Sequence, residues 1–372
     1  MFVKCHSACT LGIDAISITV EANLSMGIGM FLVGLPDNAV RESQDRIRSA
    51  FENSGLKMTG KRLVVNLAPA DIRKEGSAFD LPIAVSILAA SEQIASEHLD
   101  EYLIVGELSL DGSVKPVKGA LSIAMLAAAE GFKGLILPTE NAPQAAVVEG
   151  IDVIGVDNLR QTSDFLSGAT AIEPLRRTIE EEILTPFGNF DEDFSDVKGQ
   201  QHVKRALEIA AAGGHNAIMI GSPGSGKTML ARRMPTIMPP MTTEEILETT
   251  RIYSVAGKCA EGDALITKRP FRAPHHLASQ VALIGGGSSP QPGEVSLAHN
   301  GILFLDELPE FGRSVLEVLR QPLEDKKILV SRAKYSIEYP SNFMLIASMN
   351  PCPCGYYNHP TKECLCSSGA VA

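Results

Sequence analysis

A short glycine-rich run at residues 221–228, GSPGSGKT, constrains the fold of this chain more than any other feature. It follows the apolar run 217–220, which is typical of a buried strand, and it precedes residues 229–233, which open a helical pattern. In a strand, turn and helix of this kind, backbone N–H groups surround phosphate groups, and glycines leave room for them. The sequence therefore predicts an α/β domain that binds a nucleoside triphosphate at this turn.

The predicted nucleotide-binding residues are those of the glycine-rich run and the residue after it: Gly221, Ser222, Pro223, Gly224, Ser225, Gly226, Lys227, Thr228 and Met229. We expect Lys227 to reach the β and γ phosphate oxygens and to act in catalysis. Thr228 is expected to offer its hydroxyl to Mg²⁺. ATP and Mg²⁺ are therefore the expected cofactors.

A pair of carboxylates follows another apolar run. Residues 302–305, ILFL, predict a buried strand that delivers Asp306 and Glu307 to the carboxyl edge of a sheet, beside the glycine-rich loop. In that position Asp306 would hold Mg²⁺ through water, and Glu307 would polarise the water that attacks the γ phosphate. The alternative for such a pair is that it caps the helix that follows.

A third apolar run, 345–349, ends in Asn350. The position of Asn350 resembles that of the sensor residue of AAA+ ATPases, which hydrogen-bonds the γ phosphate or the attacking water, and we add it to the catalytic set. The alternative is a turn residue before Pro351. Residues 196–200 precede a helical pattern and resemble the segment that packs on the adenine in the same superfamily.

Composition indicates a globular protein with room for two domains. The chain has 372 residues, of which 45% are hydrophobic and 21% charged, and neither a membrane-spanning run nor a secretory leader is evident. We therefore expect a cytoplasmic protein with no membrane partner. The net charge of -11 excludes a basic footprint over the whole protein. It does not exclude a local one, because a ring-shaped motor can line its pore with a few Lys and Arg side chains.

Apolar runs alternate with alanine-rich helical patterns over the first 170 residues or so. Expected strands are 15–21, 30–34, 63–67 and 102–105, and expected helices are 40–54, 80–91 and 120–131. A polar, acidic stretch follows and is typical of a linker. We therefore expect one α/β domain over residues 1–172, a linker over 173–195 and the nucleotide-binding domain over 196–372.

Several blocks of sequence resemble the ComM/YifB family of magnesium-chelatase-like AAA+ ATPases. They lie at residues 33–37, 65–76, 199–200, 205–216, 269–276, 292–301 and 349–355, so the resemblance covers nearly the whole chain. It implies an α/β fold in which a Lon-protease-like domain of the ribosomal S5 type is followed by a P-loop AAA+ α/β/α domain with a helix-2 insert. It also implies a hexameric ATPase that acts as a DNA helicase and drives branch migration during natural transformation.

Two segments are candidates for DNA contact by this resemblance. Residues 242–296 resemble the helix-2 insert, and 327–331 with 335–339 predict a β-hairpin whose tip carries Arg332, Ala333 and Lys334. In related helicases this hairpin points into the pore, where two cations suit sequence-neutral phosphate contacts. The alternatives are a charged turn facing solvent, or an Arg332 that serves the nucleotide of a neighbouring subunit.

Residues 106–117 and 74–78 are similar to the Lon-protease domain. In Lon a lysine shortly after the proline-containing segment activates the serine, but here that stretch reads Gly119-Ala120-Leu121-Ser122. We therefore expect a scaffold or DNA-guiding domain without peptidase activity. Arg73 and Lys74 are candidates for DNA contact, and a surface salt bridge is the alternative explanation for them.

Four of the seven cysteines form two Cys-x-Cys pairs, Cys352 with Cys354 and Cys364 with Cys366. Their thiolates, with His359 between the pairs, are candidate ligands of a structural Zn²⁺. The spacing is tighter than the usual Cys-x₂-Cys, and a reduced, metal-free turn is the alternative.

The family resemblance also implies a lid and an Arg-finger region beyond residue 372. We accordingly expect an incomplete AAA+ core that hydrolyses ATP poorly by itself. Two other functions remain open. One is a chelatase-type ATPase that remodels a protein partner during Mg²⁺ insertion, and the other is an ATP-dependent peptidase.

Overall fold

The computed structural model describes residues 1–372 except 75, 184–191, 261–263, 288–289, 332–335 and 372. The described chain divides into two compact units. The first comprises Met1–Glu182 with Tyr253–Leu265, and the second comprises Ile183–Ile252 with Ile266–Ala372. The segment Tyr253–Leu265 is therefore counted with the first unit, although it lies far along the sequence. Within the described residues, no helix has the length and apolar character needed to cross a membrane.

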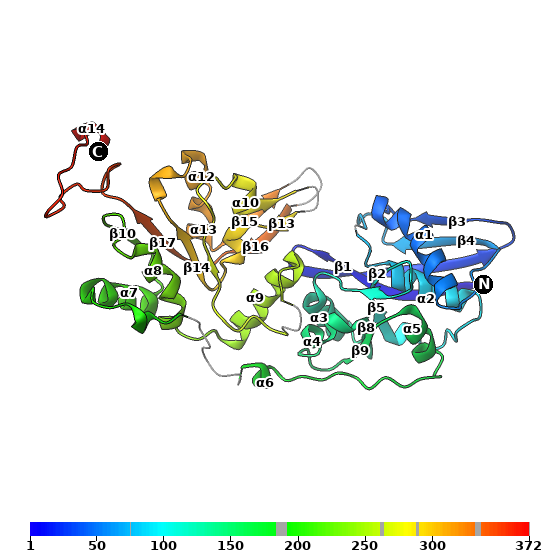
Figure 1. Cartoon of the computed structure of the whole chain (residues 1–372). Coiled ribbons are helices and arrows are strands. Elements are labelled where there is room, and N and C mark those ends of the chain that lie inside the picture. Colours follow the sequence, from blue (N-terminus) through cyan, green and yellow to red (C-terminus); the bar gives the residue numbers. More distant parts are fainter. Residues whose placement is uncertain (75, 184–191, 261–263, 288–289, 332–335, 372) are drawn as a thin grey trace. The chain divides into compact units, whose positions relative to one another are not determined.

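The first unit is built on a mixed seven-stranded sheet with the order β3-β4-β2-β1-β5-β8-β9 (Figure 1). Its strands are β1 (Phe2–Leu11), β2 (Asp14–Ser25), β3 (Met30–Val33), β4 (Arg62–Ala68), β5 (Tyr102–Ile104), β8 (Gly134–Pro138) and β9 (Asp152–Val156). The long pair β1 and β2 is antiparallel, whereas β5, β8 and β9 run parallel to one another. A short separate ribbon is formed by β6 (Glu107–Leu108) and β7 (Val114–Lys115).

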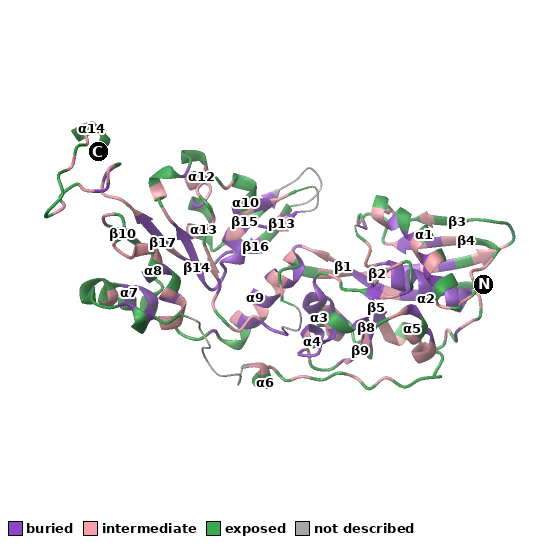
Figure 2. Cartoon of the chain, viewed as in Figure 1, coloured by how far each residue is buried: buried purple, intermediate pink, exposed green. Residues whose placement is uncertain are grey.

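Helices cover this sheet and complete its core. They are α1 (Asn38–Asn53), α2 (Asp80–Ala90), α3 (Ala120–Ala129), α4 (Ala142–Ala145) and α5 (Leu159–Leu166). A further short helix, α6 (Ile179–Ile183), lies where the first unit ends along the sequence. Every residue of α2 is buried, as its uniformly apolar sequence requires (Figure 2). Its one carboxylate, on Asp80, is paired with Arg46 of α1 at 2.7 Å, because an unpaired buried charge would be costly.

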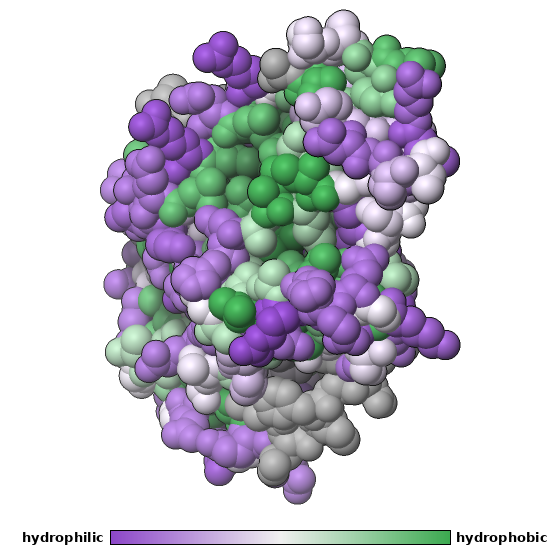
Figure 3. Space-filling view, turned by 90° about the vertical axis from the view of Figure 1, so that its left-hand side faces the viewer, coloured by the Kyte–Doolittle hydropathy of each residue, from purple (hydrophilic) through white to green (hydrophobic). Residues whose placement is uncertain are grey.

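The second unit contains a parallel four-stranded sheet with the order β10-β17-β14-β11. The strands are β10 (Ala217–Ile220), β17 (Met344–Met349), β14 (Ile302–Leu305) and β11 (Phe271–Arg272). β14 is wholly buried, whereas β10 is an edge strand whose Ile218 and Ile220 are exposed. The space-filling view onto the left-hand side of Figure 1 shows apolar residues gathered in one area, with hydrophilic residues around it (Figure 3).

The remaining elements of the second unit surround this sheet. The helices are α7 (Gln201–Gly213), α8 (Lys227–Arg233), α9 (Thr243–Ala256), α10 (Gln280–Ile284), α11 (Glu294–Leu297), α12 (Arg313–Glu317), α13 (Arg320–Asp325) and α14 (Ser368–Val371). Two antiparallel ribbons accompany them, β12 (Gly285–Gly286) with β13 (Gln291–Pro292) and β15 (Lys327–Ser331) with β16 (Ser336–Pro340). α9 is counted with the second unit only up to Ile252.

A buried tyrosine links the two ribbons. Tyr339 on β16 has no exposed surface, and its hydroxyl donates a hydrogen bond of 2.8 Å to the carbonyl of Pro290, just before β13. Burial raises the pKa of the Tyr339 phenol to about 12, so the hydroxyl remains a donor at physiological pH. The β15–β16 hairpin is therefore held to the insert segment by packing and by one directed bond.

The α/β fold expected from the sequence is the fold observed. The structure extends the expected strand 15–21 to Asp14–Ser25, and the expected hairpin strand 327–331 is β15. It adds β1, β8 and β9, which the sequence analysis did not identify.

Candidate nucleotide-binding site

The glycine-rich run forms the turn between β10 and α8, as the sequence predicts. Gly224 and Gly226 adopt left-handed backbone conformations, with φ of 75° and 85°, which other residues rarely tolerate. At Gly221, a Cβ would lie 2.9 Å from the Ser225 hydroxyl oxygen. The turn thus needs glycine at these positions for conformation and for space.

Lys227 turns its ammonium group back into the loop. It donates hydrogen bonds to the carbonyl oxygens of Gly221 at 2.8 Å and Ser222 at 3.1 Å, and to Oδ1 of Asn350 at 3.2 Å. β17 places Asn350 there, because it lies between β10 and β14 in the sheet. The structure therefore brings together the lysine and the sensor candidate, which are 123 positions apart in the sequence.

Asp306 meets the loop from the end of β14. Its Oδ2 accepts a hydrogen bond of 2.7 Å from the Thr228 hydroxyl, and its Oδ1 accepts one from the Ser348 hydroxyl. Both oxygens of the carboxylate are therefore fixed by hydroxyl groups from α8 and β17. A hydroxyl and a carboxylate at this separation are the oxygen ligands that Mg²⁺ prefers, directly or through water.

Glu307 lies beside Asp306 but faces another partner. Its backbone is left-handed, with φ of 54°, and its side chain is 58% exposed. Oε2 of Glu307 lies 3.8 Å from Nδ1 of His276, whose ring packs on His275 with centroids 4.1 Å apart. The carboxylate thus lies at the rim of the site, near a histidine that follows β11.

The loop has two features that fit phosphate groups. The Ser225 hydroxyl is buried and has no hydrogen-bond partner among the described residues, which leaves a donor for a ligand oxygen. Glycine at position 221 keeps a side chain away from this hydroxyl, because a Cβ there would crowd the Ser225 oxygen. Ser222, Pro223 and Met229 complete the predicted set, and Met229 is 41% exposed at the start of α8.

Three side chains of this site escaped the sequence analysis as individual residues. Ser348 is one, and the only sign of it in the sequence is its place near the end of β17, two residues before Asn350. His276 is another, recognised only as part of a family block. The third, Gln200, donates from Nε2 to the carbonyl of Ser225 at 2.7 Å, so it braces the loop from the segment before α7.

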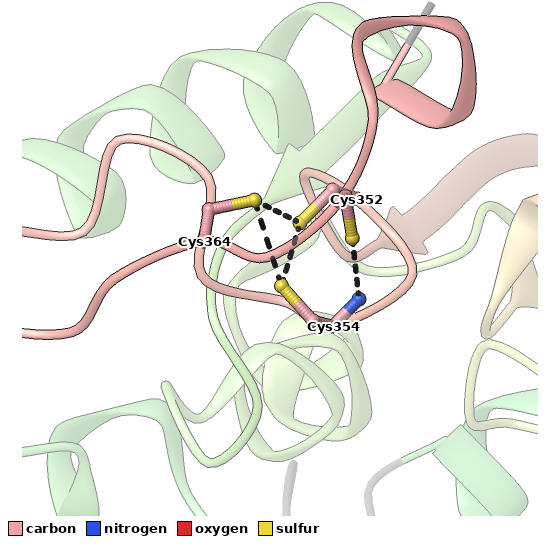
Figure 4. A group of neighbouring side chains, drawn as sticks. Cys352, Cys354 and Cys364 are labelled. Carbon is pink, nitrogen blue, oxygen red and sulfur yellow. Dashed lines mark hydrogen bonds between the residues drawn. The ribbon is translucent and has the colours of Figure 1, made fainter.

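The four cysteines form a single cluster. The Sγ atoms of Cys352, Cys354, Cys364 and Cys366 all lie within 4.8 Å of one another (Figure 4). Cys352 and Cys354 are 3.4 Å apart, and Cys364 lies 3.7 Å from the first and 3.6 Å from the second. In a tetrahedral site with Zn–S bonds of about 2.3 Å, sulfur atoms lie about 3.8 Å apart. The tight Cys-x-Cys spacing therefore does not prevent both sulfurs of a pair from facing one ion.

Backbone N–H groups also point at these sulfurs. Sγ of Cys366 accepts from the amide of Cys354 at 3.4 Å, and Sγ of Cys352 accepts from the amide of Tyr357 at 3.3 Å. The backbone near Tyr356 and the neighbouring Cys352 lower the pKa of the Cys354 thiol to about 6. His359 is not among the clustered ligands, because its Nδ1 accepts from the amides of Thr361 and Lys362.

In the first unit, the hydroxyl groups of two serines, Ser77 and Ser122, bond groups other than a lysine side chain. The Ser77 hydroxyl bonds the Glu107 carboxylate, and the Ser122 hydroxyl donates to the carbonyl of Ile13 at 2.5 Å. The interpretation of Lys74 as a DNA-contact residue is wrong. Its side chain is fully buried, it donates to the carbonyl of Pro69, and burial lowers its pKa.

Arg73 is exposed, so its candidacy stays a prediction. The expected hairpin tip, Arg332, Ala333 and Lys334, lies outside the described residues.

Comparison with known proteins places this site in a family. The chain is 46% identical over 363 residues to the uncharacterized protein YifB of Salmonella typhimurium, and this alignment covers 96% of the chain and 70% of YifB. It is also 46% identical over 353 residues to the competence protein ComM of Haemophilus influenzae, covering 95% of the chain and 69% of ComM. The chain belongs to the ComM/YifB family of magnesium-chelatase-like AAA+ ATPases. It spans about 70% of the length of these relatives.

More distant similarities agree with the two-part organisation of this ComM/YifB-family chain. Family models described as magnesium chelatase, subunit ChlI, and subunit ChlI of Mg-chelatase match residues 193–372 and 20–141. Lon protease 2 of Bacillus subtilis is 29% identical over 151 residues, covering 39% of this chain and 27% of that protein. A solved complex of magnesium chelatase subunits BchI and BchD has 22% identity and a TM-score of 0.36, covering 43% of this chain and 55% of that one. That last similarity is too low to add to the assignment.

Proposed function

We propose that this protein is an ATP-driven DNA motor that promotes branch migration in recombination, and that it acts as a hexamer during natural transformation. The ATPase part of the proposal rests on one observation, the 2.7 Å bond between Thr228 and Asp306 in a sheet that also brings Asn350 to Lys227. The DNA part is supported by the similarity to a relative named competence protein. The basic tip of the β15–β16 hairpin adds to it at the level of sequence.

Each residue of the site has a proposed role. Lys227 binds the β and γ phosphates, the loop amides and the Ser225 hydroxyl complete the cradle, and Asn350 senses the γ phosphate or the attacking water. Asp306 and Thr228 would hold Mg²⁺, which would supply positive charge to offset the charge that develops on the phosphate groups.

Glu307 is the proposed base for the attacking water. Its exposed position beside His276 leaves it free to swing toward a bound nucleotide. A DNA motor also needs this hydrolysis coupled to a change in its DNA contacts, and the β15–β16 hairpin is the element we assign to that contact.

The decisive experiment measures ATP hydrolysis by the purified protein with no DNA, with linear duplex, and with forked or branched DNA. We expect branched DNA to stimulate hydrolysis and to bind, and a Lys227→Ala variant to show no stimulated activity. A gel-shift assay on the same DNAs reports binding independently of hydrolysis. If forked and branched DNA give neither stimulation nor binding while ATP is still hydrolysed, the DNA-motor proposal is wrong.

The second candidate is a chelatase-type ATPase that remodels a protein partner. It is favoured by the family model for subunit ChlI and by the 67 kDa subunit of magnesium chelatase from Heliobacterium mobile, which is 27% identical over 191 residues. Stimulation of the ATPase by a protein partner in place of DNA would support it. An ATP-dependent peptidase is disfavoured, because the stretch Gly119-Ala120-Leu121-Ser122 offers no lysine to activate a serine, and the Ser122 hydroxyl bonds a backbone carbonyl.

We also propose that the four-cysteine cluster holds a structural Zn²⁺. The sulfur separations fit a tetrahedral site, and four thiolates are a typical structural zinc ligand set. Such a site and an ATP-dependent reaction suit the reducing cytoplasm, where we place the protein. Metal analysis of protein purified under reducing conditions tests this, with one Zn²⁺ per chain expected.

A further inference from the structure

We propose that the metal centre at Cys352, Cys354, Cys364 and Cys366 braces the phosphate loop, so that metal occupancy sets the affinity of the protein for nucleotide. This inference rests on the proposed ATP and zinc sites and adds a physical link between them. The link is a close approach of Gly355 to Pro223, that is, of the cysteine segment to the glycine-rich loop.

The cysteine cluster is joined directly to the sensor strand. Cys352 comes two residues after Asn350, and only Pro351 separates them. The carbonyl of Met349 accepts from the amide of Gly221 at 3.3 Å, so the end of β17 is bonded to the start of the phosphate loop. A shift in the turn that begins at Cys352 would therefore move the end of the strand that carries Asn350.

The same turn touches the loop a second time. The amide of Gly355 donates to the carbonyl of Cys352 at 2.9 Å and closes the turn, with φ at Gly355 of 79°. A Cβ at Gly355 would lie 2.5 Å from Cδ and 2.7 Å from Cγ of Pro223. Real Cβ atoms do not approach carbon this closely, so the Gly355 backbone is packed directly on the Pro223 ring.

The segment between the two cysteine pairs has little else to hold it. Residues 350–367 contain no helix and no strand, and of the four cysteines only Cys352 is buried. In such segments the ligand bonds to a metal supply the folding free energy that a hydrophobic core would otherwise supply. Loss of the ion would therefore loosen the turn and remove its two contacts with the nucleotide site.

The effect on nucleotide binding follows from geometry. The Lys227 ammonium lies 3.2 Å from Oδ1 of Asn350 and donates hydrogen bonds to the carbonyls of Gly221 and Ser222. The chain around the cysteine segment contacts the loop on both sides of these carbonyls, through Met349 at Gly221 and through Gly355 at Pro223. Misplacing the groups that position a substrate by about 1 Å can cost about a hundredfold in rate. We expect removal of the metal to weaken nucleotide binding about tenfold.

The test separates the brace from the metal site. The full chain is compared with Gly355→Ala, which keeps all four cysteines but clashes with Pro223, and with Gly131→Ala as the matched control. Gly131 has a similar φ of 77° and nothing within 4 Å of its Cβ position. Zinc per chain is measured by mass spectrometry of the metal, and the dissociation constant of a fluorescent ATP analogue is measured with Mg²⁺ present.

We expect Gly355→Ala to keep its zinc and to bind the analogue about tenfold more weakly, while Gly131→Ala matches the parent protein. Chelation of zinc from the parent protein should weaken binding by a similar factor, and adding Zn²⁺ back should restore it. Unchanged affinity after chelation and in Gly355→Ala would overturn the brace while leaving the metal site intact. A reduced protein without zinc would overturn the metal site itself, and a parent protein that does not bind the analogue would overturn the proposed ATPase.

Discussion

Both oxygens of the Asp306 carboxylate in the nucleotide site are hydrogen-bonded. Thr228 donates to one of its oxygens and Ser348 to the other. Thr228 would also offer its oxygen to Mg²⁺, and its hydroxyl would then have to give up the hydrogen bond to Asp306. Ser348 is not an expected Mg²⁺ ligand, so its hydroxyl can keep its hydrogen bond to Asp306. We infer that it keeps Asp306 in place while Thr228 changes partner.

A Ser348→Ala variant tests this role. Residues that orient metal ligands affect metal affinity or activity by roughly 10- to 100-fold, and we expect the Mg²⁺ concentration for half-maximal ATP hydrolysis to rise within that range. A titration of Mg²⁺ at fixed ATP measures it. Ser341→Ala is the control, because the Ser341 hydroxyl is buried in the same unit and has no hydrogen-bond partner among the described residues. Equal Mg²⁺ curves for the two variants would contradict the role of Ser348.

Glu307 and Lys227 should separate hydrolysis from binding. Removing a general base typically costs roughly 10²- to 10⁴-fold in rate, so Glu307→Gln should bind ATP normally and hydrolyse it slower by that factor. Lys227→Ala should lose binding itself, since the ammonium contacts the phosphates. Direct nucleotide binding and steady-state hydrolysis, measured side by side, check both. Weak binding by Glu307→Gln would show that this carboxylate does more than activate water.

At the scale of elements, a buried histidine joins α9 to the chain after α11. His299 is 4% exposed, its Nδ1 accepts from the amide of Asn342, and its Nε2 lies 2.8 Å from Glu248. This pattern fits a neutral ring that carries its proton on Nε2. Burial lowers the pKa of His299, and the carboxylates of Glu248 and nearby Glu245 only partly oppose the shift.

The sign of the pH dependence follows from that shift. A folded pKa below the usual 6.5 means that the unfolded chain binds the proton more readily. The stabilising contribution is therefore complete above about pH 6.5 and is lost as the pH falls from there through the folded pKa. Urea unfolding at about pH 7.5 and about pH 5.5 should show a loss of stability in the parent protein, and a smaller loss in His299→Gln. An equal loss in both proteins would assign the pH effect to other groups.

The link between the two ribbons can be tested at Tyr339. Tyr339→Phe leaves the Pro290 carbonyl without its donor, and an unmade buried hydrogen bond of this kind costs about 1–3 kcal/mol. The free energy of unfolding in urea should fall by that amount. Tyr357→Phe, at a tyrosine that is 45% exposed, should change it by less than about 0.5 kcal/mol. A cost at Tyr339 no larger than at Tyr357 would mean that packing alone holds the ribbons together.

Local patterns predicted the elements of the site well, because each is short and strongly marked. The apolar runs that became β10 and β14, and the glycines between β10 and α8, need only their own neighbours to be recognised. β1 was missed because its burial follows strand pairing with β2 and β5, whereas its sequence mixes polar and apolar residues without clear alternation.

The tertiary contacts of individual side chains could not be predicted from the sequence. Ser348 can bond Asp306 because β17 lies between β10 and β14 in the sheet. The local sequence around Ser348 does not specify this strand order. The burial of Lys74 is a similar case. A lysine is expected at the surface, and only the fold shows that the Lys74 ammonium is buried and donates a hydrogen bond to the carbonyl of Pro69.

At the scale of the whole molecule, the proposed hexamer depends on nucleotide. If ATP binds at subunit interfaces, a variant that binds without hydrolysing should assemble most completely. We expect Glu307→Gln with Mg²⁺ and ATP to form hexamers, and Lys227→Ala to remain in smaller species under the same conditions. Light scattering coupled to size-exclusion chromatography measures the mass. Hexamers of Lys227→Ala at the same protein concentration would show that assembly does not need bound nucleotide.

The burial of the Lys74 side chain has a consequence for chemical labelling of the protein. An acylating reagent will modify surface amines within moments, but this one has no exposed surface and becomes reachable only when the first unit opens locally. The rate at which the peptide that contains Lys74 is acylated therefore measures how often the first unit opens locally. Measured by mass spectrometry with and without ATP or DNA, this labelling rate would show whether a ligand changes how often the first unit opens locally.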